Sequence, residues 1–206
     1  MNALALHVHR WEPARQVNLP TLLLLHGTGG DENDLLSLGR MLVPEAALLS
    51  VRGNVLEHGA PRFFRRLAEG VFDINDLHHR TAELGDFIEA AAEQYGFPVS
   101  TLHAVGYSNG ANIAASLLLA RPTVLAGGAL LRAMVPFEPA TPPMLHGKKV
   151  LISAGRLDAM IPPAGSQRLA DLLRDAGAEV DLVWQPGSHG LTPADVKAGQ
   201  IFFAAL

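Results

Sequence analysis

The chain has 206 residues, of which 49% are hydrophobic and 17% are charged, with a net charge of -4 at neutral pH. This composition is that of a folded protein with a substantial buried core, not of a disordered chain. The negative net charge disfavours nucleic acid as a partner, and the absence of cysteine excludes disulfide bonds, thiolate metal sites and a cysteine nucleophile.

The order of polar and apolar residues predicts a cytoplasmic protein built as a single domain over residues 1–206. The first residues lack the basic start and apolar core of a secretory signal. No apolar run is long enough for stable membrane insertion. No segment resembles a linker or a repeat, so one domain is the expectation for a chain of this length.

Apolar strand patterns recur along the chain. Residues 3–10 alternate in polarity, which predicts an antiparallel edge strand. Six further strands are predicted from segments rich in leucine, valine and isoleucine, namely 21–27, 46–53, 102–108, 126–134, 148–155 and 179–187. Several of them are apolar almost throughout, which is typical of parallel strands covered by helices on both faces.

Helical patterns lie between these strands. Residues 73–96 and 166–178 each carry one apolar stripe at helical spacing. Residues 192–206 are a third predicted helix, with Thr192 as N-cap and Asp195 in the first turn. The alternation predicts an α/β fold with a mostly parallel sheet, in which ligands bind at the carboxyl ends of the strands.

A serine follows the predicted strand at 102–108. Gly106-Tyr107-Ser108-Asn109-Gly110 matches G-x-S-x-G and stands between a strand and a helix, where this pattern carries a nucleophile. The sharp turn would hold the serine hydroxyl clear of the backbone, at the positive end of the helix. The alternative is an ordinary surface turn, because the bare motif also arises by chance.

A nucleophilic serine requires a base, and two histidines follow Ser108 in the sequence. His146 precedes the strand at 148–155, which places it at the amino end of the sheet. His189 follows the last strand and therefore lies at the carboxyl end, as expected of the base in an α/β-hydrolase. His189 is the predicted base, and a solvated loop histidine is the alternative.

The acid that orients the histidine is predicted to be Asp158, which follows the strand at 148–155 and lies between the serine and the histidine in sequence. Glu138, after the strand at 126–134, is a weaker alternative. The other aspartates between Asp158 and His189 fall within predicted helices or strands and are assigned to solvated faces: Asp171, Asp175 and Asp181.

A glycine-rich loop, His26-Gly27-Thr28-Gly29-Gly30, ends the first parallel strand and precedes a helix start that Asp31 is expected to cap. Its glycines allow main-chain N–H groups to turn towards a substrate. Thr28 and Asn109, the residue after the serine, are the predicted donors of an oxyanion hole. The competing phosphate-binding interpretation lacks the P-loop lysine and the G-x-G-x-x-G spacing.

With these residues in place, the sequence resembles the carboxylesterase/phospholipase family of the α/β-hydrolase superfamily, near the acyl-protein thioesterases. The similarity is carried by "LLLLHGTGGDENDLL", "VGYSNGANIAASLL", "ISAGRLDAMIPP" and "GSHGLT". Residues 52–77 resemble a bacterial subgroup of small esterases, some of them linked to hydroquinone tolerance. The resemblance implies Ser108 as nucleophile, His189 as base and Asp158 as its orienting acid. Arg156 and Leu157 depart from the family, which often has smaller or polar residues before the acid.

The site is expected to be open. Residues 135–147 are too few for a large cap domain, and residues 52–73 are expected to arch over one side. Five side chains are candidates for substrate binding, with ordinary packing as the alternative: Phe63, Phe64, Phe72, Met134 and Met160. The arginines of the same segment are assigned to a solvated loop face in preference to a role in attracting an anionic substrate: Arg62, Arg65 and Arg66.

The sequence therefore predicts a serine carboxylic ester hydrolase that acts on short to medium acyl esters through an acyl-enzyme. An acyl thioesterase or lysophospholipase is the alternative on the same site, and a ligand-binding or sensing protein is the alternative of a different class. No metal or other cofactor is expected, because His7/His9 and His78/His79 do not have a metal-binding spacing. The expected partner is a small-molecule ester, and the expected state is a monomer or homodimer.

Overall fold

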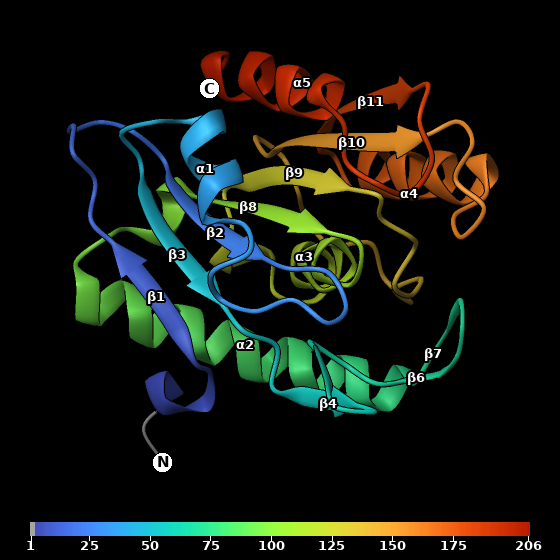
Figure 1. Ribbon diagram of the computed structural model, residues 1–206, viewed down its shortest axis with the longest axis horizontal. Coiled ribbons are helices and arrows are strands. Elements are labelled where there is room, and N and C mark those ends of the chain that lie inside the picture. Colours follow the sequence, from blue (N-terminus) through green and yellow to red (C-terminus); the bar gives the residue numbers. More distant parts are fainter. Residues whose placement is uncertain (1–2) are drawn as a thin grey trace.

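The computed structural model describes residues 3–206, which form a seven-stranded sheet in the order β1-β3-β2-β8-β9-β10-β11 (Figure 1). Strand β1 (His9–Glu12) pairs antiparallel with β3, and every other neighbouring pair in this sheet is parallel. The parallel strands are β2 (Thr21–Leu25), β3 (Ala47–Val51), β8 (Leu102–Tyr107), β9 (Gly127–Leu131), β10 (Lys149–Gly155) and β11 (Glu179–Gln185). The predicted α/β fold is confirmed.

Five α-helices cover the two faces of this sheet (Figure 1). They are α1 (Leu36–Leu42), α2 (Ile74–Tyr95), α3 (Asn109–Ala120), α4 (Pro163–Asp175) and α5 (Pro193–Ala204), with short 3-10 helices η1 (Ala3–Leu6), η2 (Val99–Thr101) and η3 (Pro122–Val124) between other elements. Helices α2, α3 and α4 pack on one face, and α1 and α5 pack on the other. Within residues 3–206, no helix combines the length and apolarity required to cross a membrane.

The strands divide their side chains between two cores. In β2, Leu23 and Leu25 join the cluster beneath α2, α3 and α4, whereas Leu22 and Leu24 join the cluster beneath α1 and α5. This is the alternation of neighbouring strand residues between the faces of a sheet. Because both faces are covered, β2 is buried along its whole length, as its unbroken leucine run predicts.

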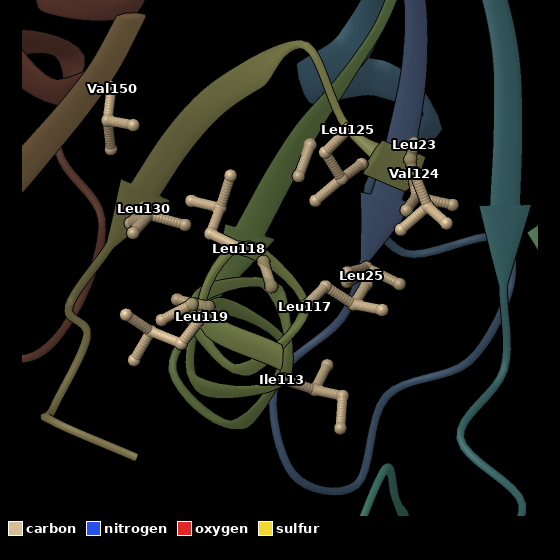
Figure 2. Packing of buried hydrophobic residues seen from close by; sticks show 14 of the residues in the cluster. Leu23, Leu25, Ile113, Leu117, Leu118, Leu119, Val124, Leu125, Leu130 and Val150 are labelled. Carbon is tan, nitrogen blue, oxygen red and sulfur yellow. The ribbon is translucent and has the colours of Figure 1, made fainter. Parts of the chain in front are cut away.

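Helix α3 is fixed tightly to the sheet. Leu117 and Leu118 lie in one cluster with Leu23 and Leu25 of β2 and Leu130 of β9 (Figure 2). Each of these leucines is fully buried, and burial of a leucine side chain contributes about 1.5–3 kcal/mol. This packing holds the first turn of α3 in place.

The N-terminal edge strand was predicted too early in the chain. Ala3–Leu6 form the 3-10 helix η1, and the strand that pairs with β3 is His9–Glu12. The physical reason is register: His9 lies opposite Val51, where β3 ends, so the residues of η1 lie beyond the last pair of the ladder. Alternating polarity does not reveal where a partner strand stops.

Helix α1 also begins later than expected. Asp31 does not cap it: the Asp31 carboxylate accepts the main-chain N–H of Asn33 at 2.7 Å, and α1 begins at Leu36. The local turn therefore uses the side chain that the prediction gave to the helix. At the other end of the chain, Thr192 is the N-cap of α5 and Asp195 lies in its first turn, as predicted, and the two residues form a capping box.

Residues 52–73 fold as two small antiparallel ribbons instead of an irregular loop. The first pairs β4 (Val55–Glu57) with β5 (Ala60–Arg62), and the second pairs β6 (Arg66–Ala68) with β7 (Val71–Phe72). The chain between β9 and β10 contains no helix, so no large cap covers the carboxyl end of the sheet within the described residues. The ribbons form one wall of the candidate site.

Candidate active site

Ser108 occupies the sharp turn between β8 and α3. Its φ is 52° and its ψ is -114°. A non-glycine residue rarely adopts a positive φ, and such a conformation costs on the order of 1–3 kcal/mol. The main chain compensates, because the Ser108 N–H donates to the Leu131 carbonyl at 2.9 Å and the Ser108 carbonyl accepts the Asn112 N–H at 3.0 Å. The position of the hydroxyl is therefore set by the backbone of the turn.

Two glycines allow the helix to approach the sheet at this turn. A Cβ at Gly106 would lie 2.6 Å from the Gly110 carbonyl oxygen, closer than real Cβ contacts. A Cβ at Gly110 would collide with the main-chain carbonyl of Leu25 in β2. The spacing of glycines in the motif is thus a packing requirement between α3 and the strands on either side of it.

Ser108, His189 and Asp158 form one hydrogen-bonded chain. The Ser108 Oγ lies 2.9 Å from His189 Nε2, and His189 Nδ1 lies 2.8 Å from Asp158 Oδ2. Asp158 is 6% exposed, and its Oδ1 accepts the main-chain N–H groups of Met160 and Ile161 at 2.9 and 3.0 Å. These bonds leave Oδ2 directed to the histidine, so Nδ1 carries the proton and Nε2 is free to accept the serine proton.

The alternatives to these residues lie elsewhere. His146 is exposed before β10, at the amino end of the sheet. Glu138 forms an exposed ion pair with Arg168 of α4, at 2.7 Å. The structure brings neither residue to the pocket beside Ser108.

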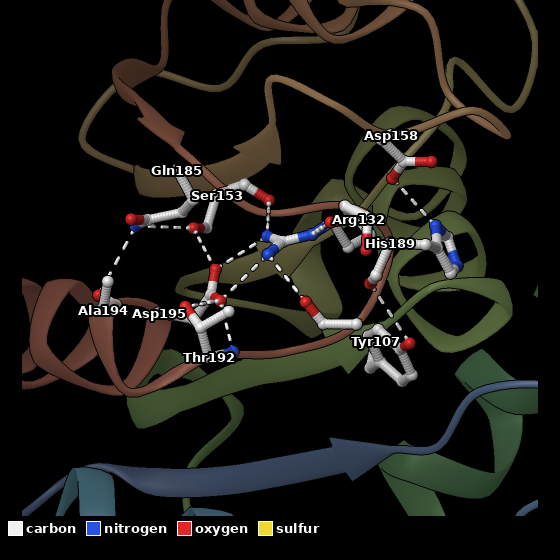
Figure 3. A network of polar contacts seen from close by, with 11 residues as sticks. Tyr107, Arg132, Ser153, Asp158, Gln185, His189, Thr192, Ala194 and Asp195 are labelled. Atoms are coloured by element: carbon white, nitrogen blue, oxygen red, sulfur yellow. Dashed lines mark hydrogen bonds and ion pairs between the residues drawn. The ribbon is translucent and has the colours of Figure 1, made fainter.

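The loop that carries His189 is bound by side chains at three consecutive carbonyl groups (Figure 3). Arg132, which follows β9, donates from Nε to the Ser188 carbonyl at 2.9 Å and from a terminal nitrogen to the Gly190 carbonyl at 3.1 Å. The Tyr107 hydroxyl donates to the carbonyl of His189 itself at 3.2 Å. These bonds fix the main chain on both sides of His189, and Asp158 fixes the orientation of its ring.

Arg132 is in turn bound by a buried carboxylate (Figure 3). Its two terminal nitrogens donate to Asp195 of α5 at 2.7 and 2.9 Å, and the Ser153 hydroxyl of β10 donates to the same carboxylate at 2.6 Å. Arg132 is 0% exposed and Asp195 is 2% exposed. Burial raises the pKa of Asp195, but the hydrogen bonds from Arg132, Ser153 and Thr192 outweigh this and hold it below its ordinary value.

Sequence reasoning missed Arg132. Its signal was a charged side chain directly after the apolar strand β9, at the end of the sheet where the predicted site residues gather. Asp195 was identified as part of the helix start, but its pairing with Arg132, which follows β9, was not predictable from local sequence. The two residues come from positions 63 apart, and only the fold joins them.

The predicted oxyanion loop is fixed by the first ribbon. The Arg62 guanidinium donates to Thr28 Oγ1 at 2.6 Å, and the Gly29 N–H donates to the Pro61 carbonyl at 2.9 Å. The Phe63 N–H donates to Asn109 Oδ1 at 2.7 Å. The end of the first ribbon and the residue that follows it therefore bind both residues predicted as oxyanion donors. Asn109 is the first residue of α3, so its main-chain N–H has no acceptor within the helix.

His26 stabilises the same glycine loop through both of its ring nitrogens. Its Nε2 accepts the Gly53 N–H at 3.0 Å, and its Nδ1 lies 2.6 Å from the Gly27 carbonyl. This requires the neutral tautomer with the proton on Nδ1. Burial lowers the pKa of His26, in agreement with a neutral ring.

The pocket beside Ser108 is small, with a cavity volume of about 40 Å³. Of the five predicted substrate-binding residues, Phe72, Met134 and Met160 lie on its wall. Phe63 and Phe64 do not: both are at most 1% exposed and belong to the core beneath the ribbons. The Phe63 ring packs on His26 at 4.8 Å between centroids, so these aromatics anchor the ribbons to the sheet.

Two arginines of the segment also differ from expectation. Arg62 is 3% exposed, and both Arg62 and Arg66 line the pocket, so they are not part of a solvated loop face. Arg65 is exposed, as predicted, and pairs with Asp73 and Asp76 of the helix start. Arg65 lies between the two ribbons and Arg66 begins the second, and of these two neighbours only Arg66 reaches the pocket.

The parallel sheet, with a serine at a strand–helix elbow and a histidine and an aspartate at neighbouring strand ends, defines an α/β-hydrolase. No family model matches the chain. MhqD of Bacillus subtilis, a protein named as a hydrolase, is 50% identical over 195 residues, which cover 95% of this chain and 96% of MhqD. The chain belongs to the carboxylesterase family of α/β-hydrolases and is an esterase.

Solved structures agree with this assignment. The carboxylesterase of Bacillus cereus superimposes with a TM-score of 0.96 at 46% identity, covering 98% of this chain and 95% of that chain. A carboxylesterase from Mesorhizobium loti superimposes with a TM-score of 0.91 at 32% identity, covering 97% of this chain and 95% of that chain. The fold class inferred from the sequence is therefore confirmed by structure as well as by sequence relatives.

The packing at the elbow leads to a prediction about Gly110. We expect Gly110→Ala to unfold the protein or to lower its free energy of unfolding by several kcal/mol, since the new methyl group would displace β2 or α3. Gly165→Ala in α4 is the matched control, because a Cβ there meets no neighbour and alanine favours a helix. Urea denaturation of both variants measures the difference, and equal stability would contradict this account of the motif.

The buried ion pair leads to a second prediction. Arg132→Met leaves Asp195 buried without its partner, and we expect a loss of about 3–5 kcal/mol in the free energy of unfolding. Arg168→Met, which removes the exposed pair with Glu138, is the control and should change stability little. Thermal and urea melts compare the two variants. A similar small effect in both would show that the buried network is dispensable.

Proposed function

We propose that this esterase is a serine carboxylic ester hydrolase in which Ser108 is the nucleophile, His189 the base and Asp158 the residue that orients the base. The observation that carries the proposal is the hydrogen-bonded chain from Ser108 Oγ through both imidazole nitrogens to a buried carboxylate, at 2.9 and 2.8 Å. The carboxylesterases among its structural relatives support the same reaction class.

The first half of the reaction forms an acyl-enzyme. His189 Nε2 takes the hydroxyl proton as Ser108 Oγ attacks the carbonyl carbon of the ester, and the carbonyl oxygen becomes an oxyanion. The main-chain N–H groups of Thr28 and Asn109 stabilise this charge. The bond between carbon and the alcohol oxygen then breaks, and the protonated His189 gives its proton to the departing alcohol.

The second half regenerates the enzyme. His189 Nε2 takes a proton from a water molecule, whose oxygen attacks the acyl carbon. The tetrahedral intermediate collapses, the bond to Ser108 Oγ breaks, and the proton passes from the imidazolium to the serine. The products are one carboxylic acid and one alcohol, with one water consumed. Asp158 stays ionised throughout and stabilises the imidazolium in both halves.

The lining of the pocket supports short to medium acyl esters as substrates. Phe72, Met134 and Met160 form an apolar wall beside Ser108, against which an acyl chain can pack. The absence of a large cap from the described residues leaves this pocket reachable by small-molecule esters.

The test uses Ser108→Ala and Asp158→Asn. Ser108→Ala should neither react with a fluorophosphonate probe nor hydrolyse 4-nitrophenyl esters above background. Asp158→Asn should keep the fold and lower kcat by about 10³–10⁴-fold, because the imidazole loses its preferred tautomer. Esters of graded chain length, a thioester and a lysolipid assayed side by side define the preferred class.

Ser37→Ala is the matched control, since Ser37 lies exposed on α1 and outside the pocket. It should label and hydrolyse like the parent protein. Labelling of Ser108→Ala at the parental rate would remove Ser108 from the mechanism.

A further inference from the structure

Two guanidinium groups lie on the wall of the pocket that contains Ser108 and His189. Arg62 ends β5 and Arg66 begins β6, so the two ribbons bring both to the same side of the cavity. The Arg62 side chain is 4% exposed and the Arg66 side chain is 28% exposed. Both are therefore partly or fully shielded from water, where a charge interacts more strongly than at an open surface.

One carboxylate is shared between these two cations. Glu57 of β4 approaches Arg66 Nε at 2.9 Å through Oε1 and Arg62 Nε at 3.1 Å through Oε2. The cluster of Arg62, Arg66 and Glu57 thus carries one surplus positive charge. Burial lowers the pKa of Arg62, and the charge of Arg66 lowers it further, as expected where cations outnumber anions.

A second acid, Glu69, also lines the pocket but offsets this charge only weakly. It lies on the exposed turn between β6 and β7, where solvent and salt screen it. The inner wall therefore remains electropositive, and the positive end of α3 at Ser108 adds to it.

Two side chains on the same wall, Arg66 and Asn109, have hydrogen-bond donors that are not used. The bonds of the Arg66 side chain within residues 3–206 use Nε, which leaves its two terminal nitrogens for a ligand. Asn109 lines the pocket and is 2% exposed, and its Nδ2 is buried without a hydrogen-bond partner among the described residues. An unpaired buried donor costs about 1–3 kcal/mol, so a ligand acceptor at this wall would be favoured.

We propose that the physiological substrate is an ester that carries a carboxylate, which the Arg66 guanidinium binds beside Ser108. This proposal rests on the proposed function and names its substrate class. A carboxylate supplies acceptors only, and it matches the planar fork of donors on a guanidinium. Its single negative charge balances the single surplus charge of the cluster, whereas a phosphate monoester carries nearly two.

Arg62 has a different part in this arrangement. It donates to Thr28 Oγ1 and to the Phe64 carbonyl, so it is committed to holding the oxyanion loop. It adds to the positive potential of the wall, while Arg66 has the free donors and the greater access. Arg66 is therefore the specificity residue to be tested.

The experiment compares matched pairs of esters. Mono-4-nitrophenyl adipate and 4-nitrophenyl hexanoate have the same acyl length and differ by a terminal carboxylate. 4-Acetoxyphenylacetate and 4-ethylphenyl acetate place the same difference on the leaving group. In at least one pair we expect kcat/KM of the parent protein to favour the carboxylate by about tenfold, the size of one charge-assisted hydrogen-bonded contact.

Variants then assign the preference to the cluster. Arg66→Gln should reduce the ratio of the two kcat/KM values to about one, and Arg66→Lys should retain part of it because it keeps the charge but not the fork. Glu69→Gln should raise the ratio by removing the opposing charge at the rim. Arg65→Gln is the matched control: it makes the same change one residue away, outside the pocket, and should leave the ratio as in the parent.

A measurement without mutation completes the test. Raising the ionic strength from about 0.05 to 0.5 M should lower the preference of the parent protein for the carboxylate, because salt screens the attraction. If both pairs show no preference for the carboxylate, or if Arg66→Gln leaves the preference intact, the inference is wrong while the esterase mechanism stands. If Ser108→Ala hydrolyses the neutral esters at the parental rate, it is the proposed mechanism that fails.

Discussion

The site depends on one buried ion pair, formed between Arg132 and Asp195. A parallel sheet delivers its catalytic groups on separate loops, and loops are the least constrained parts of a fold. Arg132 joins the end of β9 to β10, to α5 and to the loop that carries the histidine. The pair contributes little net stability relative to an apolar equivalent, since desolvation offsets its attraction. Its effect is geometric, because one side chain bonds at once to β10, to α5 and to the loop that carries His189.

The opposite wall is built on a different principle. There the two ribbons of residues 52–73 hold the glycine loop through main-chain and side-chain bonds, and Phe63 and Phe64 anchor the ribbons in the core. The two short hairpins therefore fix the position of the glycine loop, a role that a cap domain could also have. Arg62 and Arg66 of the same ribbons line the pocket, so one segment both braces the glycine loop and places positive charge beside Ser108.

The sequence was sufficient to predict the sheet and the positions of Ser108, Asp158 and His189. Unbroken apolar strands have local patterns, and residues that follow parallel strands all arrive at one edge. Phe63, Arg62 and Arg132 were not predictable, because their burial depends on partners far away in the chain. The edge strand was displaced by several residues for the same reason, since the end of β3 decides where it can pair. Local patterns predicted elements, and long-range contacts decided which polar residues are buried.

The bonds to the carbonyls of Ser188, His189 and Gly190 have a consequence for the order of events in the proposed mechanism. With three successive peptide groups held in place, the imidazole has little freedom to swing between different positions during the cycle. In the proposed mechanism, the departing alcohol and the incoming water therefore use the same place beside Nε2, one after the other. The alcohol must leave before the water molecule can enter. An alcohol that lingers there would favour return of the acyl group to it, so the rate at which this place empties governs how hydrolysis competes with transfer to another alcohol.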